Sequence, residues 1–167
     1  AQAQHDATLS HQRFAAAFSH AAIGMVVVKP DGTMLQANDA LCALLKLAPG
    51  EVLGKPFDTL LDAADAPVMQ RRAQAAQVSH DDAFSMEVQV RRGDGQQIWA
   101  AVHCSQYEDP DGGGQCLIYQ LHDVTSRHVA ESRLHHIAHH DDLTGLANRH
   151  RFHEAPEAAV ARHRPDP

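Results

Sequence analysis

Apolar and polar residues alternate along the middle of this chain, first over residues 84–91 and then over residues 97–107. Strict alternation is typical of an antiparallel strand that buries one face and leaves the other in solvent. The glycines of a Gly-Asp-Gly segment lie between the two stretches and predict a turn. In the second strand, one face carries Ile98, Ala100, Val102 and Cys104.

Three shorter apolar runs complete the predicted strands. Residues 23–28 and 33–37 flank a Pro-Asp-Gly turn, so they are predicted to form a hairpin. The third run, residues 115–122, follows a glycine-rich loop. Five strands in one antiparallel sheet, with helices crossing one face, predict an α+β fold.

Helical periodicity appears in four segments of the chain. Residues 10–19, 39–47, 65–78 and 126–140 carry apolar residues three and four positions apart. Asn38 precedes the second of these helices and suits its N-cap, because its side-chain oxygen can accept from a first-turn N–H.

The last predicted helix carries a short apolar seam. Thr125 precedes this helix and suits its N-cap. Ala130, Leu134 and Ile137 recur at spacings of four and three, as in a brief coiled coil. Two interpretations stay open at this point: the helix transmits a signal from a sensor to an output domain, or it caps its own domain.

The composition narrows the class of protein. The 167 residues suffice for one domain and a fragment, and 14 basic against 21 acidic residues give a formal charge of −7. This balance disfavours nucleic acid as a partner, because a nucleic-acid reader needs a basic face.

Cys42, Cys104 and Cys116 lack CxxC spacing, which predicts reduced thiols and a cytoplasmic location. No apolar run approaches the roughly 20 residues that span a bilayer, so membrane contact would come through a domain outside this chain.

Several short motifs follow one another along the first 125 residues. They are Ala22-Ile23-Gly24-Met25, Asp31-Gly32, residues 38–45, Gly54-Lys55-Pro56-Phe57, Arg92-Gly93-Asp94-Gly95 with Trp99, and Asp123-Val124-Thr125. Together they resemble a PAS domain over residues 11–125, after an N-terminal linker of residues 1–10. The resemblance implies a five-stranded antiparallel sheet with flanking helices. It also implies that Asp123 and Thr125 join the last strand to a signalling helix over residues 126–140.

The end of the chain carries a more specific motif. Residues 141–149 run Asp-Asp-Leu-Thr-Gly-Leu-Ala-Asn-Arg, and Phe152 follows. This resembles the opening of a GGDEF (diguanylate cyclase) domain, so residues 141–167 are predicted to be the N-terminal fragment of one. The Gly-Gly-Asp/Glu-Glu-Phe loop that handles GTP is absent from the sequence, which predicts that this chain is not itself an enzyme. Pro156 departs from the family pattern, since proline would kink the first helix.

A PAS domain can enclose a small-molecule ligand, and apolar inward positions are the candidates to line its pocket. The same side chains could instead fill the core, which is the more frequent outcome for apolar stripes. The candidate pocket residues are Phe57, Leu60, Met69, Met86, Val88, Ile98, Val102 and Tyr119.

The cofactor stays unknown at the level of sequence, although haem and flavin are disfavoured. Haem needs an axial ligand that faces the pocket. The helix over residues 65–78 has no histidine, and His103 shares the Trp99 face of its strand. The photoactive flavin class places cysteine in an Asn-Cys-Arg-Phe motif. Cys42 lies instead in an Asn-x-Ala-Leu-Cys helix and is expected to be a small buried hydrophobe.

Four histidines near the C-terminus have a spacing that can hold a metal. His135 pairs with His139, and His136 with His140, each four residues apart on a predicted helix. No cysteine or further ligand joins them, so no metal site is predicted. The GGDEF resemblance also accounts for them, because its opening often carries histidine there.

These features predict a sensory and dimerisation PAS module that regulates a C-terminal diguanylate cyclase in cyclic di-GMP signalling. Two alternatives remain: an interaction module with a filled core and no ligand, and a sensor for a GGDEF-EAL phosphodiesterase. The predicted partner is a second copy of the chain, with Phe14 and Phe18 packed near the base of the helical seam. The predicted signal relay comprises Asp123, Thr125, Leu134, Ile137, Asp141, Leu143 and Thr144.

Overall fold

The computed structural model of the protein describes residues 2–79, 83–109, 112 and 114–139. The chain divides after Thr125 into two compact units. The first unit contains the sheet and the helices that pack on it. The described part of the second unit is the helix α5.

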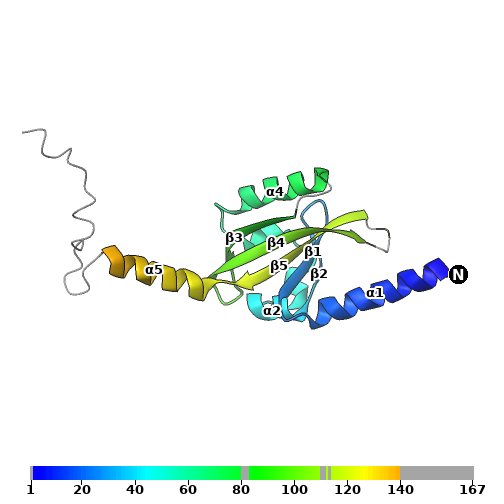
Figure 1. Ribbon diagram of the computed structural model, residues 1–167, viewed down its shortest axis with the longest axis horizontal. Coiled ribbons are helices and arrows are strands. Elements are labelled where there is room, and N and C mark those ends of the chain that lie inside the picture. The colour runs from blue at the N-terminus through cyan, green and yellow to red at the C-terminus, as the bar shows by residue number, and fades with distance from the viewer. Residues whose placement is uncertain (1, 80–82, 110–111, 113, 140–167) are drawn as a thin grey trace, which may run out of the picture. The chain divides into compact units, whose positions relative to one another are not determined.

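Five strands form one antiparallel sheet in the order β2-β1-β5-β4-β3 (Figure 1). The central strand, β5, pairs with β1 on one side and with β4 on the other. The bounds are β1 Gly24–Val28, β2 Met34–Ala37, β3 Phe84–Arg91, β4 Gln97–Asp109 and β5 Gly114–Asp123. The predicted α+β fold with a five-stranded antiparallel sheet is confirmed.

The predicted two faces of β4 are confirmed by the burial of its side chains. Ala100 and Val102 are buried on one face, whereas His103 on the other face is exposed. Both β4 and β5 are longer than predicted, because their ladder continues as far as the pair Asp109–Gly114.

Four helical segments pack against one face of the sheet. They are α2 Asp39–Leu45, α3 Pro49–Val52, the 3-10 helix η1 Phe57–Leu60 and α4 Ala66–Val78. The main hydrophobic core lies between these helices and the sheet. Helix α2 ends earlier than predicted because Lys46 adopts the left-handed conformation, with φ at 52°, and closes the last turn.

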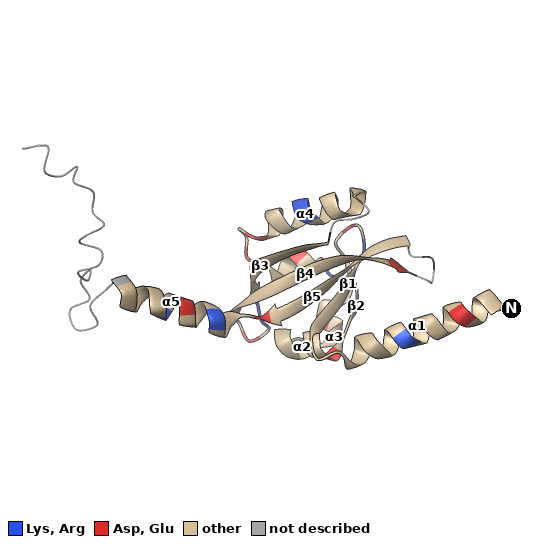
Figure 2. Ribbon diagram, in the orientation of Figure 1, with Lys and Arg blue, Asp and Glu red and all other residues tan. Residues whose placement is uncertain are grey.

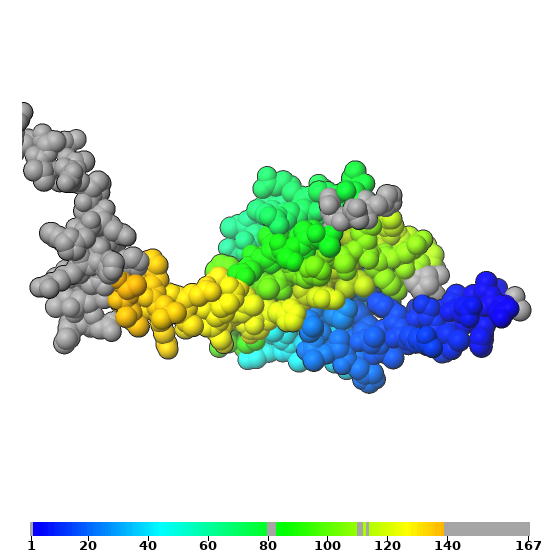
Figure 3. Space-filling view, viewed as in Figure 1, coloured from blue at the N-terminus to red at the C-terminus, as the bar shows by residue number. Residues whose placement is uncertain are grey.

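The opposite face of the sheet is covered in part by α1, Gln2–His20, whose C-terminal half lies against the strands (Figure 3). Phe18 is 6% exposed and packs with Ile118 of β5. The ring of Phe14 stacks on Tyr107, with ring centroids 4.7 Å apart. A second, smaller core therefore joins α1 to the sheet.

The N-terminal region differs from the sequence prediction in two ways. The helix predicted over residues 10–19 already begins at Gln2, so residues 2–10 continue it without an irregular linker. Phe14 and Phe18 were expected near the base of the C-terminal seam, but they pack on the protein's own sheet. Aromatic rings bury a large apolar area, and the sheet offers that area within the same chain.

Helix α5, Thr125–His139, begins one residue earlier than predicted. Its apolar side chains are largely exposed, with 66% of Leu134 and 57% of Ile137 accessible to solvent. Arg127 and Glu131 form an i,i+4 ion pair at 3.3 Å, and both signs of charge lie along this helix (Figure 2). The helix thus carries an exposed apolar stripe on an otherwise polar surface.

Some predictions fall outside the described residues. They concern the GGDEF fragment over residues 141–167, the histidine His140, and the relay residues Asp141, Leu143 and Thr144. Over the ranges that the structure does describe, no helix is both long enough and apolar enough to cross a membrane.

Candidate ligand cavity and output junction

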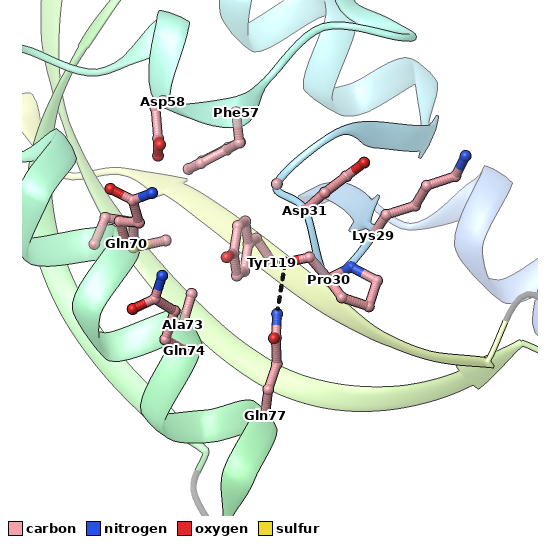
Figure 4. A pocket seen from close by; sticks show the side chains of 12 residues that line it. Lys29, Pro30, Asp31, Phe57, Asp58, Gln70, Ala73, Gln74, Gln77 and Tyr119 are labelled. Carbon is pink, nitrogen blue, oxygen red and sulfur yellow. Dashed lines mark hydrogen bonds between the residues drawn. The ribbon is translucent and has the colours of Figure 1, made fainter.

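A cavity with a volume of about 150 Å³ lies in the first unit, between α4, η1, the β1–β2 turn and β5 (Figure 4). A cavity of this size has room for several water molecules, since one water molecule needs roughly 10–15 Å³ of such space. Its walls come from segments far apart in the sequence, so only the fold assembles it. The residues that line it are Lys29, Pro30, Asp31, Gly32, Phe57, Asp58, Met69, Gln70, Ala73, Gln74, Gln77 and Tyr119.

Two aromatic rings form an apolar wall of the cavity. Tyr119 of β5 and Phe57 of η1 meet edge to face, with centroids 4.7 Å apart and planes at 60°. Met69 of α4 is buried and lines the same space. Burial, followed by the nearby Cys104 and Asp58, raises the pKa of Tyr119 far above its usual value. The phenol therefore stays protonated and can both donate and accept a hydrogen bond.

Helix α4 presents a row of three glutamines to the cavity. Gln70, Gln74 and Gln77 are spaced by four and three residues, so they share one face of the helix. Nε2 of Gln77 donates to the carbonyl oxygen of Pro30 at 3.1 Å, which joins α4 to the β1–β2 turn (Figure 4). The amides of Gln70 and Gln74 bond to no other described residue, and each offers a donor and an acceptor.

One cation and two carboxylates also line the cavity. Lys29 and Asp31 lie in the exposed β1–β2 turn. Oδ1 of Asp31 accepts from the N–H of Thr33 at 2.9 Å, and this hydrogen bond holds the pKa of Asp31 below its usual value. Asp58 of η1 is half-buried, and its carboxylate accepts no hydrogen bond from the described residues. Desolvation by burial raises the pKa of Asp58.

The structure separates the eight predicted pocket residues into two groups. Three of them, Phe57, Met69 and Tyr119, line the cavity. The other five belong to the packed core, where Leu60, Val88, Ile98 and Val102 are buried and Met86 packs against them. The ligand itself stays a prediction.

The polar part of the lining was missed by reasoning from the sequence. That reasoning selected apolar positions, because burial is the strongest signal in a strand or helix pattern. The spacing of Gln70, Gln74 and Gln77 on the predicted helix was a signal that could have identified one wall. Nothing in the sequence alone places Asp58 or the β1–β2 turn opposite that wall.

The end of β5 is tied to the start of α5 by two residues of the predicted relay. Oδ1 of Asp123 accepts from the N–H of Thr125 at 2.9 Å, and Oδ2 accepts from Nη2 of Arg92 at 3.2 Å. Oγ1 of Thr125 accepts from the N–H of Trp99 at 3.0 Å. The N–H of Val124 donates to the carbonyl of Trp99 at 2.8 Å. The hydroxyl of Thr125 therefore bonds to β4, and Thr125 is the first residue of α5 and not the residue before it, so its N-capping role stays a prediction.

Asp123 is a solvent-accessible charge within this junction. Its side chain is 36% exposed, against 17% for Arg92. Partial burial alone would raise the pKa of Asp123, but hydrogen bonding to Thr125 and the charge of Arg92 outweigh it and lower the pKa. Nε of Arg92 is buried without a partner, so the guanidinium is only partly satisfied by the carboxylate.

The first unit contains a contrasting polar residue, Asn38, which is 2% exposed. Oδ1 of Asn38 accepts from the N–H of Leu41 and of Met25, both at 2.9 Å. Nδ2 donates to the carbonyls of Phe18 and Ile23, also at 2.9 Å. The bond from Leu41 confirms the predicted N-cap of α2. The other three tie the end of α1 and the start of β1 to the same side chain.

Cysteine and histidine form no reactive centre in the described part of the chain. Cys42, Cys104 and Cys116 are free thiols, and desolvation raises the pKa of each. Nδ1 of His103 lies 2.7 Å from Oγ of Ser85 on the exposed face of the sheet. Within the described ranges, no three His, Cys, Asp or Glu residues come together as a metal site would require.

The family comparison matches the sheet-bearing unit. The PAS domain model matches residues 22–126. The PAS domain of a protein from Colwellia psychrerythraea has the same fold, with a TM-score of 0.61 at 19% sequence identity. That match covers 70% of this chain and 98% of the other.

Two curated relatives are diguanylate cyclases of Escherichia coli (strain K12). The probable diguanylate cyclase DgcE is 29% identical over 115 residues, which is 69% of this chain and 10% of DgcE. The diguanylate cyclase DgcM is 37% identical over 51 residues, which is 30% of this chain and 12% of DgcM. The chain thus matches about a tenth of the length of each relative.

Proposed function

The chain belongs to the PAS domain family, and we propose that it is the sensory and dimerisation module of a diguanylate cyclase. The domain is a sensory fold and not a catalytic one. The similarity to DgcE and DgcM supports a cyclase as the output. The Asp-x-Leu-Thr-Gly-Leu-x-Asn-Arg motif over residues 141–149 supports its position after α5.

The observation that carries this proposal is that one strand, β5, holds both the cavity and the output junction. Tyr119 lines the cavity, and Asp123 follows four residues later on the same strand. Residues four apart on a strand lie on the same face. A ligand that displaces Tyr119 would therefore act on the strand whose end is bonded to Thr125, the first residue of α5.

Dimerisation through α5 is the proposed route from the junction to the enzyme. Cyclic di-GMP is made from two GTP molecules, so two loaded catalytic domains must meet and their geometry controls the rate. The exposed Leu134 and Ile137 give α5 an apolar stripe for a second copy. A change at the junction would shift the equilibrium between two arrangements of the two α5 helices in the dimer.

A chimera tests this proposal. Residues 1–149 are fused, at the shared motif, to the catalytic domain of a well-behaved diguanylate cyclase, and cyclic di-GMP production is measured. Arg92→Gln removes the cation beside Asp123 and is expected to change the output several-fold. Arg91→Gln is the matched control, because the neighbouring Arg91 is exposed and makes no bond to Asp123. Equal output from both variants and the unmodified chimera would contradict the proposed relay.

A ligand-free interaction module is the second candidate. It is favoured by the five predicted pocket residues that belong to the packed core. Native mass spectrometry of the purified chain separates the two candidates. A bound small molecule supports the sensor, whereas a dimer without any bound mass, unchanged by candidate ligands, supports the interaction module.

A further inference from the structure

We propose that the cavity binds a small organic ammonium compound that also carries a hydroxyl or amide group, with Asp58 as its counter-charge. The inference rests on the proposed sensory function, because it names the class of ligand for the same cavity. Two observations support it. Several side chains that line the cavity have no hydrogen-bond partner among the described residues, and the charged groups of the lining sum to a negative charge (Figure 4).

Asp58 is the centre of the proposed site. It lines the cavity from η1 and is half-buried, and its carboxylate has neither a hydrogen bond nor an ion pair with any described residue. A carboxylate that loses hydration without gaining a partner is destabilised in its charged form. An ammonium group placed in the cavity would supply up to three N–H donors and the missing positive charge.

Neutral hydrogen-bonding groups surround the carboxylate. The amides of Gln70 and Gln74 project from α4, and the hydroxyl of Tyr119 projects from β5 (Figure 4). None of the three bonds to another described residue. Each can donate and accept, so they suit a ligand hydroxyl or amide next to the ammonium group. The wall of Phe57 and Met69 gives the carbon chain an apolar surface.

The charge around the cavity disfavours anionic ligands. Asp58 and Asp31 are opposed by one cation, Lys29, so the lining carries a net negative charge. Lys29 is exposed on the β1–β2 turn, and no arginine is among the lining residues. Proteins that bind carboxylate or phosphate typically present arginine in a bidentate arrangement, which this cavity does not offer.

The volume sets the size of the ligand. A space of about 150 Å³ is smaller than the roughly 300–1,000 Å³ of pockets for drug-sized ligands and cofactors. It accommodates an amino alcohol or an amino amide with a few carbon atoms. Such a ligand would bridge η1 and α4 to Tyr119 of β5, the strand that ends at the output junction.

Three probes of nearly equal size test the charge requirement. Ethanolamine, ethylene glycol and glycolate share one hydroxyl group, and their second group is an ammonium, a hydroxyl and a carboxylate, so they are cationic, neutral and anionic at neutral pH. Each is titrated into the whole 167-residue chain at constant ionic strength, and amide chemical shifts are followed by NMR. Ethanolamine is expected to bind at least tenfold more tightly than the other two, with shifts in α4, η1 and β5. Equal or tighter binding of ethylene glycol or glycolate, or no binding of ethanolamine, would overturn the proposal.

Two matched variants test the assigned residue. Asp58→Asn keeps the shape and removes the charge, so ethanolamine binding is expected to fall at least tenfold. Asp6→Asn removes a carboxylate from the exposed N-terminal part of α1, outside the cavity lining, and is expected to change binding less than threefold. Circular dichroism checks that both variants fold. Ethanolamine binding that survives Asp58→Asn, or that falls as much in Asp6→Asn, would refute the role of Asp58.

The two experiments distinguish a wrong ligand class from a wrong proposed function. The chimera reports on the junction of Arg92 and Asp123 without any added ligand. If Arg92→Gln changes cyclase output but ethanolamine does not bind, the relay stands and the ligand class is wrong. If ethanolamine binds but the chimera does not respond to Arg92→Gln, the ligand class stands and the proposed relay is wrong.

Discussion

Two side chains, Asn38 and Asp123, connect the helices at the two ends of the domain to its sheet, and they do so in different ways. Asn38 is 2% exposed and bonds to α2, β1 and the end of α1 through all four of its hydrogen-bonding positions. Asp123 is 36% exposed in its side chain, and it bonds to Arg92 and to the first residue of α5. The first connection is neutral and buried, and the second is charged and in contact with water.

This difference indicates which of the two connections costs less free energy to rearrange. A buried, fully bonded amide is costly to disturb, because each bond lost leaves an unsatisfied group away from water. A partly exposed ion pair contributes little net free energy, because water can replace it. The junction at Asp123 can therefore rearrange at a lower cost in free energy than the junction at Asn38.

The end helices repeat this contrast in their apolar residues. Phe14 and Phe18 of α1 are used within the chain, against the sheet. Leu134 and Ile137 of α5 remain exposed. The N-terminal helix is thus part of the domain's own packing, whereas the C-terminal helix keeps these apolar side chains at its surface, where a second copy of the chain is their proposed partner.

Leu134→Asp tests whether the exposed stripe of α5 is an interface, and it carries the largest expected effect. Burying one leucine contributes about 1.5–3 kcal/mol, and a two-fold interface contains the residue twice. The variant is expected to weaken dimerisation by a factor of more than about a hundred. Analytical ultracentrifugation measures the association, with circular dichroism as the check of folding.

Ser132→Asp is the control for this test, since it adds the same charge to α5 away from the stripe of Ala130, Leu134 and Ile137. It is expected to dimerise like the unmodified chain. An equally dimeric Leu134→Asp would show that the stripe is not the interface. Unfolding of Leu134→Asp would show that α5 belongs to the core of the domain, and the contrast between the end helices would disappear.

Asn38→Ala tests the rigidity of the buried connection. It leaves two N–H groups and two carbonyls without their partner, and the expected loss in free energy of unfolding is about 4 kcal/mol. Urea denaturation followed by circular dichroism measures it. Asn38→Asp keeps the acceptor for Leu41 and Met25 but loses both donated bonds, so it should also destabilise the fold. A loss below about 1 kcal/mol for Asn38→Ala would contradict the role given to this residue.

Phe18→Ala tests whether α1 belongs to the domain. A phenylalanine that is 6% exposed is expected to cost about 3 kcal/mol on truncation. Leu9→Ala, at 39% exposure on the same helix, is expected to change the stability by less than about 0.5 kcal/mol. Chemical denaturation of both variants makes the comparison. Equal stability of the two would mean that α1 does not pack on the sheet in solution.

Asp123→Asn tests the exposed connection and carries the smallest expected effect. The pKa of Asp123 is lowered in the folded state from its ordinary value of 3.8. Its ionised form therefore stabilises the fold above that value, and this stabilisation is lost as the pH falls through the lowered pKa. Asp123→Asn should be slightly less stable than the unmodified chain at neutral pH, and the difference should vanish in acid. Thermal unfolding across the acid range checks this, and a difference that grows on acidification would reverse the sign of the argument.

The sequence alone determined the sheet, the order of its elements and the resemblance to a PAS domain. Alternation with period two assigns the faces of β4, because successive side chains on a strand point to opposite sides. A local rule likewise identified Asn38 as the N-cap of α2, because the capping bond to Leu41 spans only three residues. Such signals depend on neighbours along the chain, and a single sequence contains them in full.

Only the tertiary structure decided which partners these residues meet across the fold. The bond from Asn38 to Phe18 joins residues 20 positions apart, and the bond of Thr125 to Trp99 joins residues 26 apart. The cavity is likewise set by how α4 and η1 lie on β5, which places Asp58 and the glutamines opposite Tyr119. Hydrophobic patterns specify that a face is buried but not against what, because apolar attraction has no direction. For this reason the sequence assigned the apolar residues of both α1 and α5 to a dimer interface. The structure shows instead that those of α1 pack on the sheet of the same chain.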